Sequence, residues 1–490
     1  MLNRGECAMT LNRHVDLIVV GGGAAGLAAA RAAEDAGMRC QLFEAQDQLG
    51  GRVRTRVLTT GEVVDEGAQM INGDMQAMLD LAREANETIV PLSKAGIGLC
   101  VLEDKFLRFE ELIDIDDVHD LLSEQIVRWD SPREILRALH LKLKWWSTPW
   151  ESVGEAKRGV QHLLDLPDSP KNSLAGALRA LLLEEEEHVL ARSYFTETFG
   201  AALEDLHIQT VREAFERYPS ERDDLEFHFA GGMGKVLQHL ATGLCHTPKL
   251  NAPVSRVRTV DDHVEVITGD QTWTAGAVVV AVPPPAARNI TFETEDAGEI
   301  APLLSSFSAG DMIKTTLQFD KAFWRFKGNS GAAVFADVPG LAVVDGSGAN
   351  PAAASLITFL GGPLARDWAA LPADKRQDSL LQNLARVFGE DVLHPRTVTE
   401  AIWVDDPWCG GGYNATIRVG GDPDAIGKLA SRKGRVRFAG AEVSDRFWGY
   451  VEGAIHSGRS TIETLCSDGT LRVGSKPSDI HLESEAGSPT

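Results

Sequence analysis

The stretch Asp16–Gly37, DLIVVGGGAAGLAAARAAEDAG, constrains the fold more than any other part of this 490-residue chain. A short apolar run of the kind that forms a buried strand leads into a glycine turn, and an alanine-rich segment that favours a helix follows. The next segment, RCQLFEA, predicts a second strand that ends at Glu44. We therefore expect a βαβ unit of about thirty residues near the start of the chain.

Gly21, Gly23 and Gly26 have the GxGxxG spacing between the predicted strand and helix. In dinucleotide-binding domains the first glycine allows a tight turn, the second lets the backbone approach a pyrophosphate, and the third lets helix and strand pack closely. The helix N-terminus adds amide donors and a partial positive charge. Glu44 is placed to accept a ribose hydroxyl. The alternative is a purely structural turn, but the pattern favours nucleotide binding, with Ala25 of the same turn as a further contact.

A second glycine pair, Gly50 and Gly51, follows with Arg52 in the sequence LGGRVRT. Such a pair with an arginine can close over the same diphosphate. A contiguous Rossmann domain that binds NAD does not need this element. The combination therefore favours FAD over NAD.

Further α/β segments lie in the middle and at the end of the chain, and a largely helical insertion and a mixed segment separate them. We predict an α/β fold, a Rossmann-like FAD-binding domain with an interleaved α+β substrate domain. The predicted ranges are 10–75, 230–290 and 400–466 for the FAD-binding domain, 76–229 (largely helical) and 291–399 for the substrate-binding domain, and 467–490 for a mobile tail.

Composition excludes several classes of function. A formal net charge of -23 argues against nucleic acid and anionic membrane surfaces as partners. The six cysteines are scattered without metal-ligand spacing, so we expect free thiols in a reducing compartment and no metal site. No apolar run is long enough to span a bilayer, and the N-terminal residues lack an apolar signal core. These features predict a cytoplasmic protein.

From about Asp16 to Leu465 the chain resembles the flavin-containing amine oxidase family, whose members are similar to monoamine oxidase. The fingerprint, the acid and the GGR turn match the family's opening pattern, VVDEGAQMI resembles its next flavin-lining turn, and LNAPVSRV its adenine-packing segment. RFAGAEVSDRFWGYVEGAIHSG resembles the flavin-binding close, where the N–H of Val451 would bond a carbonyl of the flavin ring. The positions that the resemblance adds as cofactor contacts are Gly67, Ala68, Val254, Gly440, Glu442, Gly449 and Val451.

The resemblance implies that FAD oxidises an amine to an imine by hydride transfer, with hydrolysis of the imine and reoxidation by O2 to H2O2. It places Tyr413 and Tyr450 as an aromatic pair on either side of the amine, although both could simply be core aromatics. Lys314 matches the family's lysine that holds a water against the flavin. On a strand it shares a face with Met312, and the alternative is a solvated lysine at a sheet edge.

Two rival functions are also compatible with the sequence: an FAD-dependent desaturase on the same fold, or a flavin-binding scaffold without turnover. Amino-acid oxidases of this superfamily clamp the substrate carboxylate with an arginine. The sequence AQMINGDM after Gly67 has no arginine, so a small amine without a carboxylate is favoured, while a clamp from the insertion stays open. A homodimer is one option for the assembly.

Cys409, in DPWCGGGYNAT, raises the question of a covalent flavin. Some relatives tether FAD through a cysteine directly before the first tyrosine of the aromatic pair, but here Gly412 occupies that position. Cys409 lies three residues earlier, up to ~10 Å of extended backbone away. With no histidine near it in sequence it is also a poor nucleophile. We therefore predict a small turn residue and non-covalent FAD.

Overall fold

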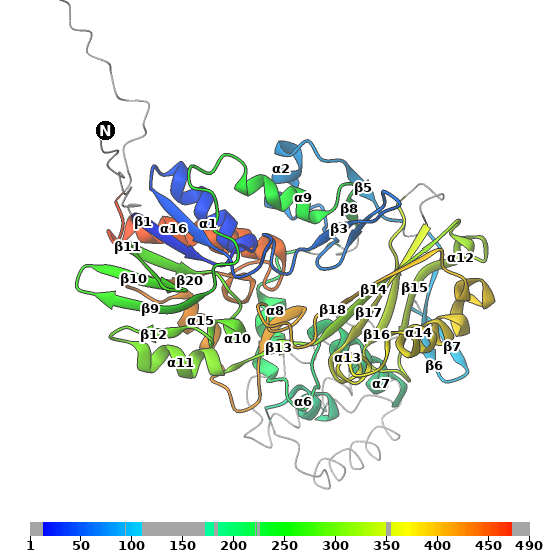
Figure 1. Ribbon diagram of the computed structural model, residues 1–490. Helices are drawn as coiled ribbons and strands as arrows, with labels where there is room; N and C mark the ends of the chain where they lie inside the picture. The colour runs from blue at the N-terminus through cyan, green and yellow to red at the C-terminus, as the bar shows by residue number, and fades with distance from the viewer. Residues whose placement is uncertain are drawn as a thin grey trace, which may run out of the picture.

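The computed structural model describes residues 13–93, 95–109, 172–180, 185–220, 222, 226–348 and 354–472. Two seven-stranded sheets lie toward opposite ends of these described residues, and helices pack on both (Figure 1). Each sheet contains segments that are far apart in the sequence, so the chain crosses between the two repeatedly.

Strand β1 (His14–Val20) lies inside the first sheet, parallel to β2 on one side and to β11 on the other. Strand β11 is long enough to have two partners on its other edge: its first half pairs antiparallel with β10 and its second half parallel with β20. The remaining bounds are β2 (Cys40–Phe43), β9 (Val254–Val260), β10 (His263–Thr268), β11 (Gln271–Val280), β12 (Thr291–Glu293) and β20 (Val436–Phe438). The predicted βαβ unit is confirmed, and β9, β10 and β11 form antiparallel pairs at the edge of the same sheet.

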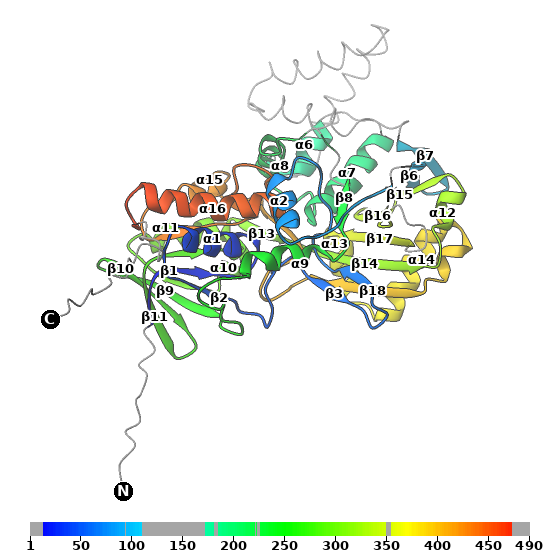
Figure 2. The ribbon, with the colours of Figure 1, turned by 90° about the horizontal axis from the view of Figure 1, so that it is seen from above.

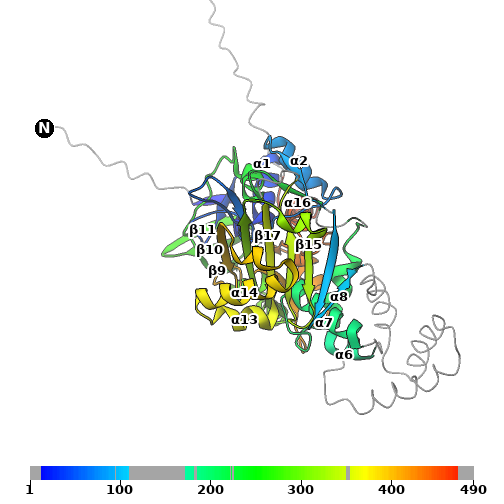
Figure 3. The same ribbon diagram turned by 90° about the vertical axis from the view of Figure 1, so that its right-hand side faces the viewer.

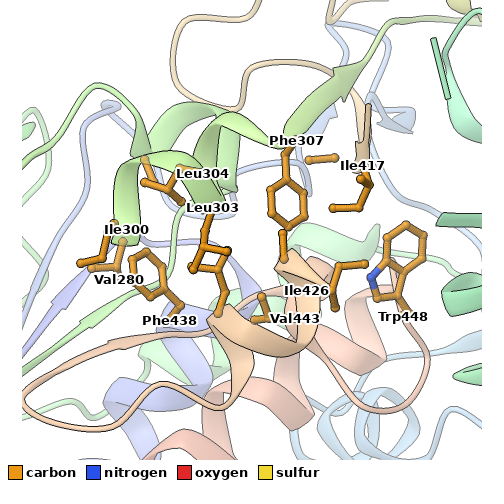
Figure 4. Close-up of a cluster of buried hydrophobic side chains, with 14 of the residues drawn as sticks. Val280, Ile300, Leu303, Leu304, Phe307, Ile417, Ile426, Phe438, Val443 and Trp448 are labelled. Carbon is orange, nitrogen blue, oxygen red and sulfur yellow. The ribbon is translucent and has the colours of Figure 1, made fainter. Parts of the chain in front are cut away.

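Helices α1 (Ala24–Asp35) and α16 (Val451–Ser467) lie side by side over one face of this sheet (Figure 2). The alanine-rich face of α1 is buried against Leu17 and Val19 of β1 and against Ile455 of α16. Because alanine has a short side chain, the helix can approach both the sheet and its neighbour closely. The opposite face carries another apolar cluster, in which Phe438 of the sheet packs against Ile300 and Leu303 of α11 (Ala297–Ser305) (Figure 4).

The second sheet has the strand order β18-β14-β17-β16-β15-β6-β7. Its bounds are β6 (Ile97–Leu102), β7 (Lys105–Arg108), β14 (Met312–Phe319), β15 (Asn329–Phe335), β16 (Leu341–Asp345), β17 (Ala354–Gly361) and β18 (Thr397–Ile402). Helices α13 (Gly362–Ala369) and α14 (Ala373–Phe388) cover one face (Figure 3). Ile313 and Leu317 of β14 pack into the cluster with α14, so the alternation of the strand turns Met312 and Lys314 to the other face.

Part of the segment predicted to be largely helical is strand instead. It does contain helices α2 (Gln76–Glu84), α6 (Leu174–Ala180), α7 (Glu185–Phe199) and α8 (Ile208–Glu216). Residues 97–108, however, form the β6–β7 hairpin because β6 extends the second sheet by pairing in parallel with β15. Strands β5 (Ile89–Pro91) and β8 (Phe227–Phe229) pair with each other. At the other end of the chain, Leu471 of the predicted tail is buried, and residues 473–490 lie outside the described residues.

A carboxylate from α16 caps helix α2 and so joins distant parts of the chain. Glu452 is 1% exposed, and its two oxygens accept hydrogen bonds of 2.9 Å from the backbone N–H groups of Ala77 and Met78. These amides lie in the first turn of α2, where no intrahelical partner is available for them. The same glutamate lies in the first turn of α16, where a negative charge is favourable.

We expect Glu452→Gln to lower the free energy of unfolding by about 1.5–3 kcal/mol, the typical contribution of a hydrogen bond to a charged group. The glutamine keeps one acceptor but turns an NH2 group toward the second amide. Glu463→Gln, at an exposed position of the same helix, is the matched control and should stay within about 0.5 kcal/mol of the wild type. Denaturant unfolding of the purified protein measures both, and equal stabilities of the two variants would contradict the capping role.

Candidate active site

A cavity of about 970 Å³ lies between the two sheets and receives residues from both and from the insertion. Gly26 is the predicted site residue that does not line it. Those that do line it are Gly21, Gly23, Ala25, Glu44, Gly51, Arg52, Gly67, Ala68, Val254, Lys314, Tyr413, Gly440, Glu442, Gly449, Tyr450 and Val451. All four tyrosines of the chain are in the lining. The structure therefore brings the predicted cofactor contacts and the predicted amine contacts to one space.

The first glycine turn presents bare backbone to this cavity. A Cβ atom on Gly23 would find its nearest neighbour, the Gly50 carbonyl oxygen, at 3.9 Å, so the space in front of this residue is open. A Cβ atom on Gly26 would lie 1.9 Å from the Gly21 carbonyl oxygen, which explains why Gly26 serves packing and not the lining. The second glycine pair lies against this turn, because the Gly50 N–H donates to the Gly22 carbonyl at 2.9 Å. The turn, open to the N-terminus of α1, fits a diphosphate.

Glu44 closes one side of this cradle. Its carboxylate accepts hydrogen bonds from the backbone N–H groups of Gly22 at 2.6 Å and Gln46 at 2.8 Å. Burial raises the pKa of Glu44, and these backbone hydrogen bonds oppose that rise. Pro253 and Val254 provide an apolar wall in the same lining. A fixed carboxylate beside an apolar wall fits a nucleoside, with the sugar hydroxyls on the acid and the base on the wall.

Arg52 is engaged within the protein and does not present a free charge to the cavity. Its guanidinium donates to both carboxylate oxygens of Glu442, at 2.6 and 3.1 Å, and to the carbonyl of Tyr413 at 3.0 Å. Glu442 is 1% exposed and also accepts from the N–H of Ala415. We predicted from sequence that the arginine closes over a diphosphate. In the structure this arginine lines the cavity and joins three cavity-lining segments that are far apart in the chain, and its contact with a diphosphate stays a prediction.

The N-terminus of α16 opens onto the same cavity. Gly449, Tyr450 and Val451 line it, Tyr450 is the N-cap residue, and Val451 is the first residue of the helix. The 17-residue helix directs its positive dipole end into this space. A negatively charged ring system is therefore stabilised there.

Lys314 is 4% exposed, so the alternative of a solvated lysine is wrong. Its strand β14 also lies between β17 and β18, not at a sheet edge. The ammonium group donates to the carbonyl of Gly67 at 2.7 Å and to the Gln69 side-chain oxygen at 2.8 Å. Burial lowers the pKa of Lys314 to about 8, although the carboxylates of Asp65 and Glu66 oppose this shift.

Both tyrosines of the predicted pair have a polar or aromatic neighbour. The Tyr413 hydroxyl donates to an oxygen of Glu197 at 2.6 Å. The ring of Tyr450 lies 5.2 Å from that of Tyr218, at an interplanar angle of 38°. Tyr218 in turn makes an edge contact with Phe447. Tyr413 and Tyr450 therefore line the cavity with side chains that contact a neighbouring residue, Glu197 and Tyr218 respectively.

Four further residues line the cavity although no sequence motif marks them: Tyr194, Glu197, Tyr218 and Arg222. A signal exists for α7, because Tyr194, Glu197 and Thr198 have the i, i+3, i+4 spacing of one helix face and all line the cavity. No such pattern marks Arg222. We found no arginine near the segment after Gly67, but the structure places Arg222 against it, within 3.1 Å of where a Cβ of Gly73 would lie.

Cys409 lies in a small buried cluster with Met312, Ala401 and Trp403. Burial raises the pKa of its thiol to about 12, so the reactive thiolate is scarce. At Gly412, the tether position of some relatives, a Cβ would lie 2.7 Å from the Cβ atoms of both Met312 and Trp403. The backbone there leaves no room for a tethering side chain.

The described residues contain no group of three His, Cys, Asp or Glu side chains placed to hold a metal ion. Within the same part of the chain, every helix is too short or too polar to cross a membrane. The described cysteines Cys40, Cys100, Cys245, Cys409 and Cys466 are free thiols. The tryptophans at 145, 146 and 150 lie outside the described residues.

Comparisons with known proteins agree with a flavin site in this cavity. A family model described as flavin containing amine oxidoreductase matches residues 24–463. An L-amino acid dehydrogenase from Synechocystis sp. is 25% identical over 480 residues, covering 95% of this chain and 97% of the relative. A putative flavin-containing monoamine oxidase from Mycobacterium tuberculosis is 26% identical over 452 residues, covering 91% and 95%.

Among solved structures, cyclohexylamine oxidase from Brevibacterium oxydans has the same fold, with a TM-score of 0.77 at 24% identity over 93% of this chain and 99% of that one. The family match spans most of the chain, and the glycine cradle fits the cofactor that the family uses. The chain therefore belongs to the flavin-containing amine oxidoreductase family, and its cofactor is FAD.

Proposed function

We propose that this protein oxidises a small amine without a carboxylate to the imine, that water hydrolyses the released imine, and that O2 reoxidises the flavin and yields H2O2. The observation that supports this most is that Lys314, Tyr413 and Tyr450 line the same cavity as the glycine cradle. Bound FAD supplies the hydride acceptor for the carbon next to the substrate nitrogen. A desaturase or an inactive scaffold would not need this lysine and this aromatic pair together.

The two tyrosine rings orient the substrate nitrogen in this proposal. Electron-rich ring faces favour cationic or strongly dipolar nitrogen groups. Tyr413 is held by Glu197 and Tyr450 by the ring of Tyr218, so each keeps its position before the amine enters. Aliphatic side chains of the second sheet, among them Val334 and Val344, give the cavity an apolar wall.

The charges in the lining favour an amine over an amino acid. Arg222 could bind a carboxylate, but Glu226 already accepts hydrogen bonds from its Nε at 2.8 Å and its Nη2 at 3.0 Å. Glu226 also holds the N–H of Gly73. The Glu197 carboxylate would repel a second carboxylate in the cavity. The likeness to an L-amino acid dehydrogenase makes the amino acid the alternative to exclude.

The test uses two compounds that differ only in a carboxylate, 2-phenylethylamine and L-phenylalanine. Each is mixed with the purified protein without oxygen, and loss of the oxidised flavin absorbance is followed. The amine should reduce the flavin with an efficiency at least about tenfold above that of the amino acid, because the amino acid must bury an unpaired carboxylate. A preference for L-phenylalanine would assign an amino-acid substrate, and no reduction by a wider amine panel would end the proposal.

Gly23→Ala should weaken FAD binding at least about tenfold, or about 1.4 kcal/mol, without unfolding the protein. The new methyl group enters open cavity, where the diphosphate is expected, and the φ of -77° suits alanine. Gly26→Ala is the contrast, because its methyl group meets backbone and should destabilise the fold by about 1–3 kcal/mol. Flavin titration and unfolding curves measure the two effects. Wild-type flavin affinity in Gly23→Ala would refute this placement.

Lys314→Met should slow reoxidation of the reduced flavin by O2 at least about tenfold while changing reduction by amine much less. A buried positive charge favours the negative charge that develops on oxygen during electron transfer. Since the pKa of Lys314 is about 8, its ammonium is lost as the pH rises through that value. The rate of reoxidation of the wild type should therefore fall as the pH rises through about 8, and the rate of the variant should not change with pH.

Stopped-flow measurement of the two half-reactions decides the role of Lys314. Lys321→Met is the control. Lys321 is exposed and lies two residues beyond the end of β14, so this variant should behave as wild type. Equal effects of Lys314→Met on both half-reactions would mean that this lysine shapes the cavity without acting on oxygen.

A further inference from the structure

Glu197 puts a carboxylate into the cavity next to the predicted amine position. One of its oxygens, Oε1, accepts the hydrogen bond from the Tyr413 hydroxyl at 2.6 Å. No cationic side chain among the described residues forms an ion pair with it. Its helix α7 lines the cavity with Tyr194 and Thr198 on the same face. The second oxygen, Oε2, is therefore available to a ligand in the cavity.

The backbone that carries Glu197 is fixed against the second sheet. Phe195 is fully buried, and the Ser193 hydroxyl donates to the carbonyl of Phe335 in β15 at 3.0 Å. Just beyond the end of α7, the carbonyl of Gly200 accepts from the N–H of Asp311 at 2.7 Å. The carboxylate is thus presented from a rigid element.

The charged groups on the elements packed around α7 are paired with other residues or exposed. Arg366 of α13 pairs with Asp311, Arg179 of α6 and Arg192 of α7 pair with Glu204, and Asp345 of β16 pairs with Arg325. Asp367 of α13 is exposed. Strands β15 and β17 carry no charged residue. The titratable group that contacts Glu197 is Tyr413 of β19 (Tyr413–Ile417), and Tyr450 and Tyr194 in turn act electrostatically on Tyr413.

Amines enter at neutral pH as ammonium ions, because an alkylammonium has a pKa of about 10, like that of a lysine side chain. Loss of hydride from the neighbouring carbon needs the free electron pair of the neutral nitrogen. We propose, on the basis of the amine oxidation proposed above, that Glu197 is the group that takes this proton. One N–H bond of the ammonium breaks, one O–H bond forms on Oε2, and both partners become uncharged.

Burial supports this direction of transfer. A carboxylate and an ammonium together in an apolar cavity both lose hydration, whereas the neutral acid and the neutral amine lose much less. Burial raises the pKa of Glu197 to about 7, although the hydrogen bond from Tyr413 opposes this shift. Burial and the neighbouring Glu197 raise the pKa of Tyr413 well above 10, so the phenol remains a donor and does not compete for the proton.

Glu197→Gln tests the role, because glutamine can still accept from Tyr413 but cannot take a proton. The efficiency of anaerobic flavin reduction by 2-phenylethylamine is measured against pH. The variant can use only the neutral amine present in solution. Its efficiency of flavin reduction should therefore rise about tenfold per pH unit up to about pH 10. The efficiency of the wild type should stay constant from about pH 7 to about pH 10, because Glu197 is ionised above about pH 7. The ratio of wild-type to variant efficiency, which is the deficit of the variant, should therefore be largest near neutral pH and should fall as the pH rises.

Two results would overturn the assignment: an unchanged profile in Glu197→Gln, or a deficit of constant size at every pH, which marks a structural role. Glu216→Gln, an exposed carboxylate on the neighbouring helix α8, should leave the profile unchanged. If the wild type itself shows no reduction by any amine, the proposed amine oxidation fails, which is a separate outcome.

A second measurement needs neither turnover nor a variant. tert-Butylamine has no hydrogen on the carbon next to nitrogen, so it binds without being oxidised. Calorimetry in buffers of different ionisation enthalpy counts the protons released on binding. With Glu197 as acceptor, about one proton should be released below pH about 7 and almost none above it. A count that does not change through this range would contradict the proposal.

Discussion

The ion pair between Arg52 and Glu442 is the interaction on which the rest of the site depends. The two residues are 390 positions apart in the sequence. Tyr413, whose carbonyl accepts from the same guanidinium, is 361 positions from Arg52. Glu442 is almost fully buried, so removing either partner leaves a charge without compensation, at a cost of about 3–5 kcal/mol. The pair joins the second glycine turn, strand β19 and the segment that leads to α16. Each of these contributes lining residues to the cavity.

Once these segments are joined, the cavity has two ends with different chemistry. The glycine turn, Glu44 and the N-terminus of α16 supply backbone amides and fixed dipoles, which suit a phosphate-bearing cofactor and its ring. The other end combines tyrosine rings, aliphatic side chains and the buried groups Lys314 and Glu197. Burial moves the pKa of the lysine down to about 8 and that of the glutamate up to about 7. Both groups can therefore change protonation state near neutral pH, as acid–base groups of an active site do.

Sequence predicted the features that depend on local pattern. The βαβ unit, Gly23, Gly26, Lys314 and the tyrosine pair follow from spacing or from family motifs, and the structure places them in or beside one cavity. What sequence could not supply were pairings across long separations. The guanidinium of Arg52 binds Glu442, and Arg222 approaches Gly73 from another segment. The sequence did not distinguish Glu197 from a solvated acid, since helix periodicity gives a face but not what that face contacts.

The most direct test of this account is a double-mutant cycle at Arg52 and Glu442, with the dissociation constant of FAD as the measured quantity. We expect Arg52→Met and Glu442→Gln each to weaken FAD binding at least about tenfold, because each leaves a buried charge unpaired. The double variant should bind FAD no more weakly than the single variants, which gives a coupling energy of about 1 kcal/mol or more. Losses that simply multiply in the double variant, or single variants with wild-type affinity, would show that the cavity does not depend on this pair.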